Sequence, residues 1–312
     1  METEARYTSR KVRAVVPSFS ALEREKSRFA EINLQRHRLL PKAALLGLIT
    51  GLLAAAFHYI LGKGEMLRNS LIDFAHQYGL QGMVLPVLFS LAAVSMSAWL
   101  VRRFAAEAAG SGIPHIKAVL QGYRTLSWPR VLCIKFLSGV VGISGGLVPG
   151  REGPTVQMGG AVGKALGSGS LKKLEEDRVL IAAGGGAGLT AAFNAPLAGL
   201  VFVLEELQGK LASLEFFTAA VACLVSDLIC RLMFGQLPVL QVTVTHIPTL
   251  ADLPISVFLG IVAGLLGVAF NKWILVLSEL SSPGQPRSIV VWCTIWGMVI
   301  GVFGWYVPKL IG

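Results

Sequence analysis

Charged residues are scarce in this chain, since only 15% of its 312 residues are Asp, Glu, Lys or Arg while 54% are hydrophobic. With a mean hydropathy of +0.64, this composition is typical of a membrane protein. Several apolar segments are long enough to cross the roughly 30 Å hydrocarbon core of a bilayer. We expect membrane spans at about residues 42–62, 80–101, 128–148, 179–204, 212–234, 254–278 and 288–308.

The sequence also lacks the patterns typical of a zinc protease or another metal site. The sequence has no His-Glu-x-x-His, and its five histidines show no spacing typical of metal ligands. The four cysteines lie within apolar runs, so we interpret them as small hydrophobic core residues. We therefore expect no enzyme, no cofactor and no metal. The cysteines are Cys133, Cys223, Cys230 and Cys293.

The net charge of +10 comes largely from Lys and Arg residues that flank apolar segments. No nucleic-acid-binding motif accompanies them, so this charge indicates membrane topology and attraction to a lipid surface rather than nucleic-acid binding. In residues 1–42 basic residues outnumber acidic ones, and the apolar core of a cleavable signal peptide is missing. By the positive-inside rule, we expect this N-terminal segment to be cytoplasmic.

One short motif places charged residues between two long apolar segments: Gly150 to Pro154, which reads Gly-Arg-Glu-Gly-Pro. A glutamate inside a membrane is costly and by default marks a functional site. The glycines allow a sharp bend, and Pro154 suits the first turn of a helix. The N-terminus of such a helix favours an anion, either the Glu152 carboxylate or a small ion that replaces it. A carboxylate that competes with an anion for one site is the basis of a gate.

Two further glycine-rich stretches predict interrupted helices at membrane depth. The first is Gly110 to Pro114, which reads Gly-Ser-Gly-Ile-Pro, and the second runs from residue 183 to 188 and leads into Phe193-Asn194-Ala195-Pro196. The Ser111 hydroxyl and nearby N–H groups could hold an unhydrated halide. The alternative is that Ser111 only caps a helix.

An internal repeat is visible in the apolar segments. Residues 46–57 align with residues 259–270 at a constant offset, and both glycines and the phenylalanine match. Such repeats, often inverted in the membrane, are common in transporters. We divide the chain into a cytoplasmic segment (1–41), a first membrane repeat with the anion-site motifs (42–234), a loop (235–253) and the start of a second repeat (254–312). The same offset would place the second copy of these motifs beyond residue 312, so we expect the second repeat to be incomplete.

The order of the motifs resembles that of the CLC family of chloride channels and proton-coupled chloride exchangers. Gly-Ser-Gly-Ile-Pro is followed by Gly-Arg-Glu-Gly-Pro, then by Phe-Asn-Ala-Pro-Leu-Ala-Gly and by Glu205-Glu206. The resemblance, closest to the bacterial exchanger branch, implies an all-α bundle of tilted and broken helices that moves chloride, in exchange for protons, across a bacterial inner membrane. It also implies a homodimer that forms through helices at about residues 196–232.

The resemblance assigns roles to individual residues. Glu152 would be the external gate and Glu206 the internal proton relay, which favours an exchanger over a channel. The Ser111 hydroxyl would face the chloride ion. The anion site would comprise Ser111, Gly112, Ile113 and Gly153, and the remaining motif residues would be Gly110, Pro114, Gly150, Arg151 and Pro154.

The sequence also departs from the family's pattern. His115 and Lys117 stand where bacterial relatives commonly have acidic residues. A pair of Lys117 with Lys135 would lack the opposite charge that such relatives supply, so we assume no salt bridge between these two positions. A later Gly-x-Phe-x-Pro signature and a late chloride-contacting tyrosine are missing. Two alternatives therefore remain: a non-conducting relative that acts only as a membrane or dimer partner, and a passive chloride channel.

Overall fold

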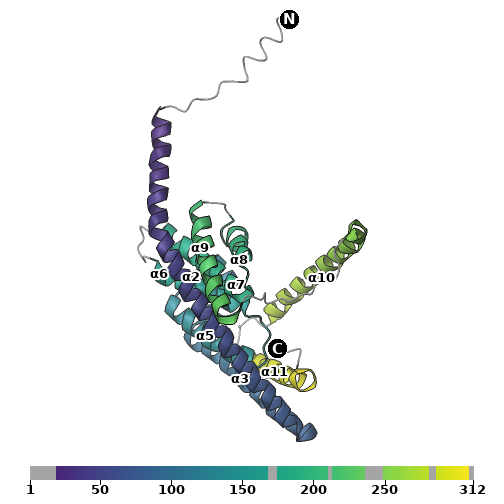
Figure 1. The fold of residues 1–312 in the computed structure, drawn as a ribbon. Helices are drawn as coiled ribbons and strands as arrows, with labels where there is room; N and C mark the ends of the chain where they lie inside the picture. The colour runs from purple at the N-terminus through teal and green to yellow at the C-terminus, as the bar shows by residue number, and fades with distance from the viewer. Residues whose placement is uncertain (1–18, 168–173, 210–212, 236–248, 281–285, 309–312) are drawn as a thin grey trace.

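The computed structural model describes residues 19–167, 174–209, 213–235, 249–280 and 286–308, and every regular element in these ranges is helical. The longer helices form an elongated bundle (Figure 1). This agrees with the predicted all-α membrane fold. The α-helices are α2 (Phe19–His76), α3 (Val84–Phe104), α4 (Ile113–Leu120), α5 (Trp128–Ser144), α6 (Glu152–Leu166), α7 (Leu174–Phe193), α8 (Pro196–Phe202), α9 (Ser213–Phe234), α10 (Leu253–Leu280) and α11 (Pro286–Tyr306). Short 3₁₀ turns are η1 (Gly79–Met83), η2 (Ala106–Ala108) and η5 (Leu250–Asp252), and η4 (Val203–Gln208) is a π-helix.

Four helical segments in the described part of the chain are long and apolar enough to cross a membrane. They are His37–His76, Gly79–Phe104, Ser213–Phe234 and Leu250–Leu277. Four of the predicted spans, 42–62, 80–101, 212–234 and 254–278, lie within these helices or differ from them by one residue at an end. The first helix is longer than predicted because α2 continues through Pro41, although a proline inside a helix removes one backbone hydrogen bond.

The core of the bundle lies where α6 crosses α7, and α2 and α9 pack against this pair. The contact between α6 and α7 depends on glycine. A Cβ atom on Gly184 would lie 2.1 Å from the carbonyl oxygen of Gly159, and a Cβ on Gly159 would meet Gly184 equally closely. Small residues allow membrane helices to approach at backbone distance, so the glycines of these segments determine how closely the core packs.

The predicted span at 179–204 is two helices rather than one. α7 ends at Phe193, and α8 begins at Pro196. Between them Asn194 adopts a left-handed conformation with φ of 58°, which asparagine tolerates better than most residues. Proline fits the first turn of the next helix because its missing N–H would have no partner there. The interruption predicted at Phe193 to Pro196 is therefore confirmed.

The two copies of the sequence repeat lie in different surroundings. In α2, a Cβ atom on Gly47 would lie 2.5 Å from the carbonyl oxygen of Ala222 in α9, whereas nothing lies within 4 Å of the equivalent Gly260 in α10. α10 projects away from the bundle (Figure 1), and none of the residues in its apolar, membrane-spanning stretch is buried. α11, in contrast, packs along α3, with Gly301 against the backbone of Val87. The repeat itself stays a prediction.

The cysteines are not all core residues. Cys223 and Cys230 are buried in α9, as predicted, and Cys293 is half-buried in α11. Cys133 is exposed on α5, so the interpretation of it as a core residue is wrong. An apolar run in a membrane helix has no water-facing side that would mark which residues point inward.

Candidate anion and proton sites

The two predicted helix starts lie directly against each other. α4 begins at Ile113, with Pro114 in its first turn, and α6 begins at Glu152. A Cβ atom on Gly153 would lie 2.3 Å from the carbonyl oxygen of Ser111 and 2.6 Å from its hydroxyl oxygen. Only glycine permits this approach, so the first turn of α6 lies against the residue that precedes α4. The structure thus brings Gly153 against Ser111, and Gly112 and Ile113 follow Ser111 directly in the chain.

The N-cap of α4 is Gly112 rather than Ser111. Gly112 has φ of 94°, a left-handed conformation that favours glycine, and no side-chain cap hydrogen bond is formed. The alternative interpretation of Ser111 as a helix-capping serine is therefore wrong. The Ser111 side chain is exposed and lines a cavity of about 550 Å³ between α3, α5 and the start of α6.

Glu152 occupies the first position of α6, and its carboxylate folds back over the bend that precedes the helix. Gly150 has φ of 77°, and a Cβ atom there would lie 2.2 Å from Glu152 Oε2. The carboxylate therefore covers the left-handed glycine closely. A negative group at the first turn of a helix is stabilised by the positive end of the helix dipole. Pro154 follows, buried in the first turns of α6.

Ser111 and Glu152 line different cavities. The cavity beside Ser111 also contacts Gly110, Pro154 and Lys135. The cavity beside Glu152 has a volume of about 250 Å³ and also contacts Glu65, Gly150 and Arg151. The N-terminal turn of α6 contributes to both, because Pro154 faces the first and Glu152 the second. The start of α6 is thus the boundary between two hollow regions.

Lys135 holds the loop that carries Ser111. Its side chain is buried on α5, with only 4% exposed, and its Nζ donates hydrogen bonds to the carbonyl oxygens of Ala108 at 2.9 Å and Gly110 at 2.6 Å. Among the described residues, no carboxylate forms a salt bridge with Lys135. Lys135 thus lines the same cavity as Ser111 and fixes the backbone just before it.

Lys117 forms a salt bridge that the sequence did not predict. Lys117 Nζ lies 2.7 Å from Glu206 Oε1, and the two side chains are 40% and 50% exposed. Glu206 is in η4, directly after α8, and Lys117 is in the last turn of α4. Sequence comparison with the family's pattern could not reveal the pair, because the two residues are 89 positions apart.

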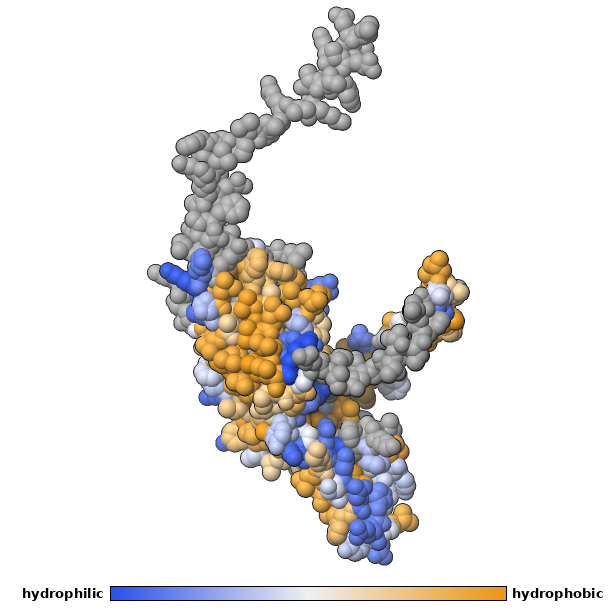
Figure 2. Space-filling view, viewed as in Figure 1, coloured by the Kyte–Doolittle hydropathy of each residue, from blue (hydrophilic) through white to orange (hydrophobic). Residues whose placement is uncertain are grey.

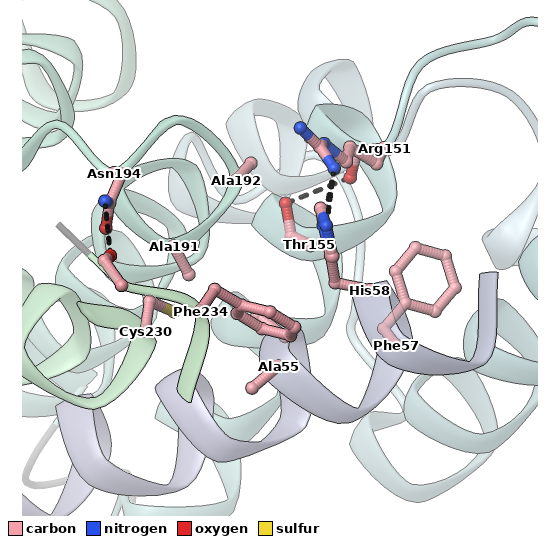
Figure 3. A pocket seen from close by; sticks show the side chains of 12 residues that line it. Ala55, Phe57, His58, Arg151, Thr155, Ala191, Ala192, Asn194, Cys230 and Phe234 are labelled. Carbon is pink, nitrogen blue, oxygen red and sulfur yellow. Dashed lines mark hydrogen bonds between the residues drawn. The ribbon is translucent and has the colours of Figure 1, made fainter. Parts of the chain in front are cut away.

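Arg151 lies beside His58 of α2 (Figure 3). Its guanidinium donates a hydrogen bond to the His58 ring, and both residues line a small cavity of about 80 Å³ together with Thr155 and Asn194. Thr155 Oγ1 donates to the carbonyl oxygen of Arg151 at 3.1 Å, which stabilises the first turn of α6. Sequence reasoning missed His58, since it lies in α2 outside any motif.

Gln157 is a second residue that sequence reasoning missed. Its side chain is fully buried in α6, and its Nε2 donates to the carbonyl oxygen of Glu107 at 2.8 Å. The same nitrogen lies 3.0 Å from His115 Nδ1. Gln157 thus connects α6 to the segment before Ser111 and to α4. A polar residue in an apolar helix was the available signal, because buried amides need partners.

A serine pattern known from hydrolases, Gly-x-Ser-x-Gly, is present at residues 142–146. Its Ser144 ends α5, is nearly buried and packs against Gly64 of α2. In hydrolases this pattern requires a sharp turn between a strand and a helix that exposes the serine. Ser144 has neither feature, so its surroundings do not resemble a nucleophile site.

Comparisons with known proteins agree with the geometry. The family model described as "Voltage gated chloride channel" matches residues 91–312, which include all of the site motifs. A crystal structure of a slow cyanobacterial Cl⁻/H⁺ antiporter has a TM-score of 0.80 and 34% identity, covering 86% of this chain and 64% of that one. A eukaryotic CLC transporter has a TM-score of 0.70 and 25% identity, covering 89% and 51%.

A CLC-type fluoride/proton antiporter has the same fold, with a TM-score of 0.64 at 20% identity, covering 86% of this chain and 66% of that one. The chain therefore spans about two thirds of the length of the cyanobacterial antiporter and about half that of the eukaryotic transporter. With its family-model match, its fold and its paired helix starts at Ser111 and Glu152, the chain belongs to the voltage-gated chloride channel (CLC) family.

Proposed function

We propose that this protein moves chloride across a membrane in exchange for protons, and that Glu152 is the gate. The observation that carries the proposal is the packing of the start of α6 against Ser111, with the Glu152 carboxylate folded over Gly150. An acidic side chain and the Ser111 hydroxyl, which we propose contacts the anion, thus lie at one pair of helix starts.

The gate follows from electrostatic exclusion. Two negative charges cannot easily occupy neighbouring positions in a low-dielectric site, so an ionised Glu152 and a chloride ion at the start of α6 exclude each other. Protonation of Glu152 removes its charge and frees the position. Each chloride that enters is then linked to a proton on the carboxyl group. Lys135, which donates to the carbonyl oxygen of Gly110 and lines the cavity beside Ser111, is the basic residue of α5 that would lie nearest this path.

The proposal is tested by chloride efflux from liposomes that contain the purified chain, with external pH recorded alongside. We expect efflux coupled to proton uptake. Glu152→Gln should keep chloride flux and abolish the proton flux, because an amide cannot carry the proton. Glu65→Gln is the matched control, since Glu65 lines the same cavity as Glu152 and should leave coupling unchanged.

Three results would contradict the proposal. Absence of efflux from well-inserted protein would refute transport by this chain alone and favour a non-conducting partner. Chloride flux without proton flux would favour a passive channel. Coupling that survives Glu152→Gln would remove Glu152 from the gate.

We assign the internal proton relay to Glu206, which the resemblance to proton-coupled relatives supports. Glu206 is exposed on η4, at one end of the short helices that follow α7. Glu206→Val should keep chloride flux and stop proton flux. Glu205→Val is its control, because Glu205 is the adjacent exposed carboxylate. A variant Glu206→Val that still pumps protons would exclude the relay role.

We propose further that the protein is a homodimer in a bacterial inner membrane, with a cytoplasmic N-terminus. Support comes from large apolar side chains exposed on α8 and α9, where Figure 2 shows a mostly apolar face. A cysteine at Leu228 of α9 should cross-link two copies, whereas one at Leu265 of the projecting α10 should not. Equal cross-linking at both positions would contradict this interface. The exposed side chains are Leu197, Val201, Phe217, Leu224, Leu228 and Leu232.

A further inference from the structure

The helix α4 physically links the two proposed ion sites. Its first turn follows Ser111 and Gly112 at the anion site, and its last turn carries Lys117. Lys117 Nζ lies 2.7 Å from Glu206 Oε1 in η4, the proposed proton relay. One helix of eight residues therefore contacts the anion path at one end and the proton path at the other.

The local structure favours a cation at this position. The C-terminal end of a helix carries partial negative charge, which stabilises a lysine in the last turn. Glu206 lies in a π-helical segment, a type of helix that is rare and often found at functional sites. Within the part of the chain that the structure describes, Lys117 is the one cation that pairs with Glu206 within 4 Å.

Other charged groups lie on the elements that contact η4, but within the described residues none of them forms an ion pair with Glu206. Glu205 is the neighbouring carboxylate on η4 itself. Arg231 of α9 is paired with Asp227 of its own helix, at 2.6 Å. The remaining titratable residues on α4, α7 and α9 are His115, Glu175, Glu176, Asp177, Arg178, Glu215, Cys223 and Cys230.

We propose that Lys117 is a positioning residue that restrains proton loading: its ammonium holds one oxygen of the Glu206 carboxylate and has to move aside before a proton binds at that oxygen. This inference rests on the proposed exchange of chloride for protons. Lys117 acts through Glu206 and has no direct role in chloride binding.

The size of the effect follows from exposure. Both side chains are about half exposed, so solvent screens the pair and its contribution is small. We expect Lys117→Met to raise the proton flux about two- to fivefold, which corresponds to about 0.4–1 kcal/mol. The increase in proton flux should appear at neutral pH on the side of the membrane that Glu206 faces, because proton loading then limits exchange. The increase should shrink at acidic pH, where loading is no longer limiting.

The test compares five variants in the liposome assay, with proton and chloride fluxes recorded at several values of internal pH. Lys117→Met should speed proton flux, and Lys117→Arg should restore wild-type behaviour because arginine keeps the charge. The double variant Lys117→Met with Glu206→Val should match Glu206→Val alone. Lys63→Met is the matched control, because Lys63 is an exposed lysine on α2 away from Glu206, and it should have no effect.

The outcomes separate this inference from the function on which it rests. If the wild-type protein carries no protons, or if Glu206→Val does not change proton flux, the proposed exchange or relay fails and the role of Lys117 falls with it. If wild-type exchange is coupled and Glu206→Val uncouples it, but Lys117→Met equals wild type at every pH, only the role of Lys117 is overturned. An equal gain in Lys63→Met would attribute the effect to general surface charge.

Discussion

The close contact between α6 and α7 makes a specific prediction for Gly184. In Gly184→Ala the new Cβ would lie 2.1 Å from the carbonyl oxygen of Gly159, whereas ordinary contact begins at 3.4 Å. The two backbones therefore have to separate by about 1.3 Å, since neither partner is the flexible end of a side chain. Overpacking of this kind typically lowers the free energy of unfolding by about 1–3 kcal/mol.

A glycine-to-alanine change also alters helix propensity, so the comparison needs a control of the same type. Gly62 lies inside α2, and a Cβ there would meet nothing within 4 Å. Gly62→Ala should leave stability unchanged or raise it by up to about 1 kcal/mol, the gain in helix propensity. The difference between the two variants then isolates packing. Gly185→Ala should fall between them, because its Cβ would contact a leucine side chain, Leu207, at 3.1 Å.

The assay is thermal unfolding of detergent-purified protein, followed by loss of the monodisperse peak on size-exclusion chromatography. For a chain of this size we expect the midpoint of Gly184→Ala to lie roughly 2–12 °C below that of Gly62→Ala. The order should be Gly62→Ala, Gly185→Ala, Gly184→Ala, from most to least stable. Equal midpoints for Gly184→Ala and Gly62→Ala would refute the claim that this crossing is at backbone contact.

Two other substitutions test buried polar contacts. Lys135→Met removes the donor to the carbonyl oxygens of Ala108 and Gly110. We expect the free energy of unfolding to fall by about 1–3 kcal/mol for each carbonyl group left unpaired, and chloride binding measured by calorimetry to weaken. Lys135→Arg should be less affected. Unchanged chloride affinity would show that Lys135 only supports the fold. Asp177→Asn weakens the 2.7 Å ion pair with Lys164, in which the Asp177 side chain is only 4% exposed. It should lower the free energy of unfolding by about 1.5–3 kcal/mol in the same thermal assay. The ratio of transported protons to chloride should not change. A changed ratio would contradict a purely structural role.

Much of the architecture was predictable because its causes are local. Apolar runs of sufficient length predicted the membrane helices, and the left-handed glycines at 112 and 150 lie at the predicted bends. The interruption at Asn194 and Pro196 could be predicted for the same reason, since a chain interrupts its helix where its own residues disfavour helical geometry. The boundaries of α2 were less predictable, because nothing local shows that tertiary contacts keep the helix intact through Pro41.

The sequence by itself determined the fold class, the helix starts and the two motif residues, Ser111 and Glu152, because each depends on the chemistry of adjacent residues. Only the tertiary structure decided that Lys117 pairs with Glu206, that Lys135 bonds to the loop before Ser111, and that α6 and α7 meet at bare backbone. Those features depend on which distant segments come together. The conformational preferences of neighbouring residues do not predict such long-range contacts. A lysine can be placed equally well beside solvent, a carbonyl oxygen or a carboxylate, and the packing of the helices decides which of them it contacts.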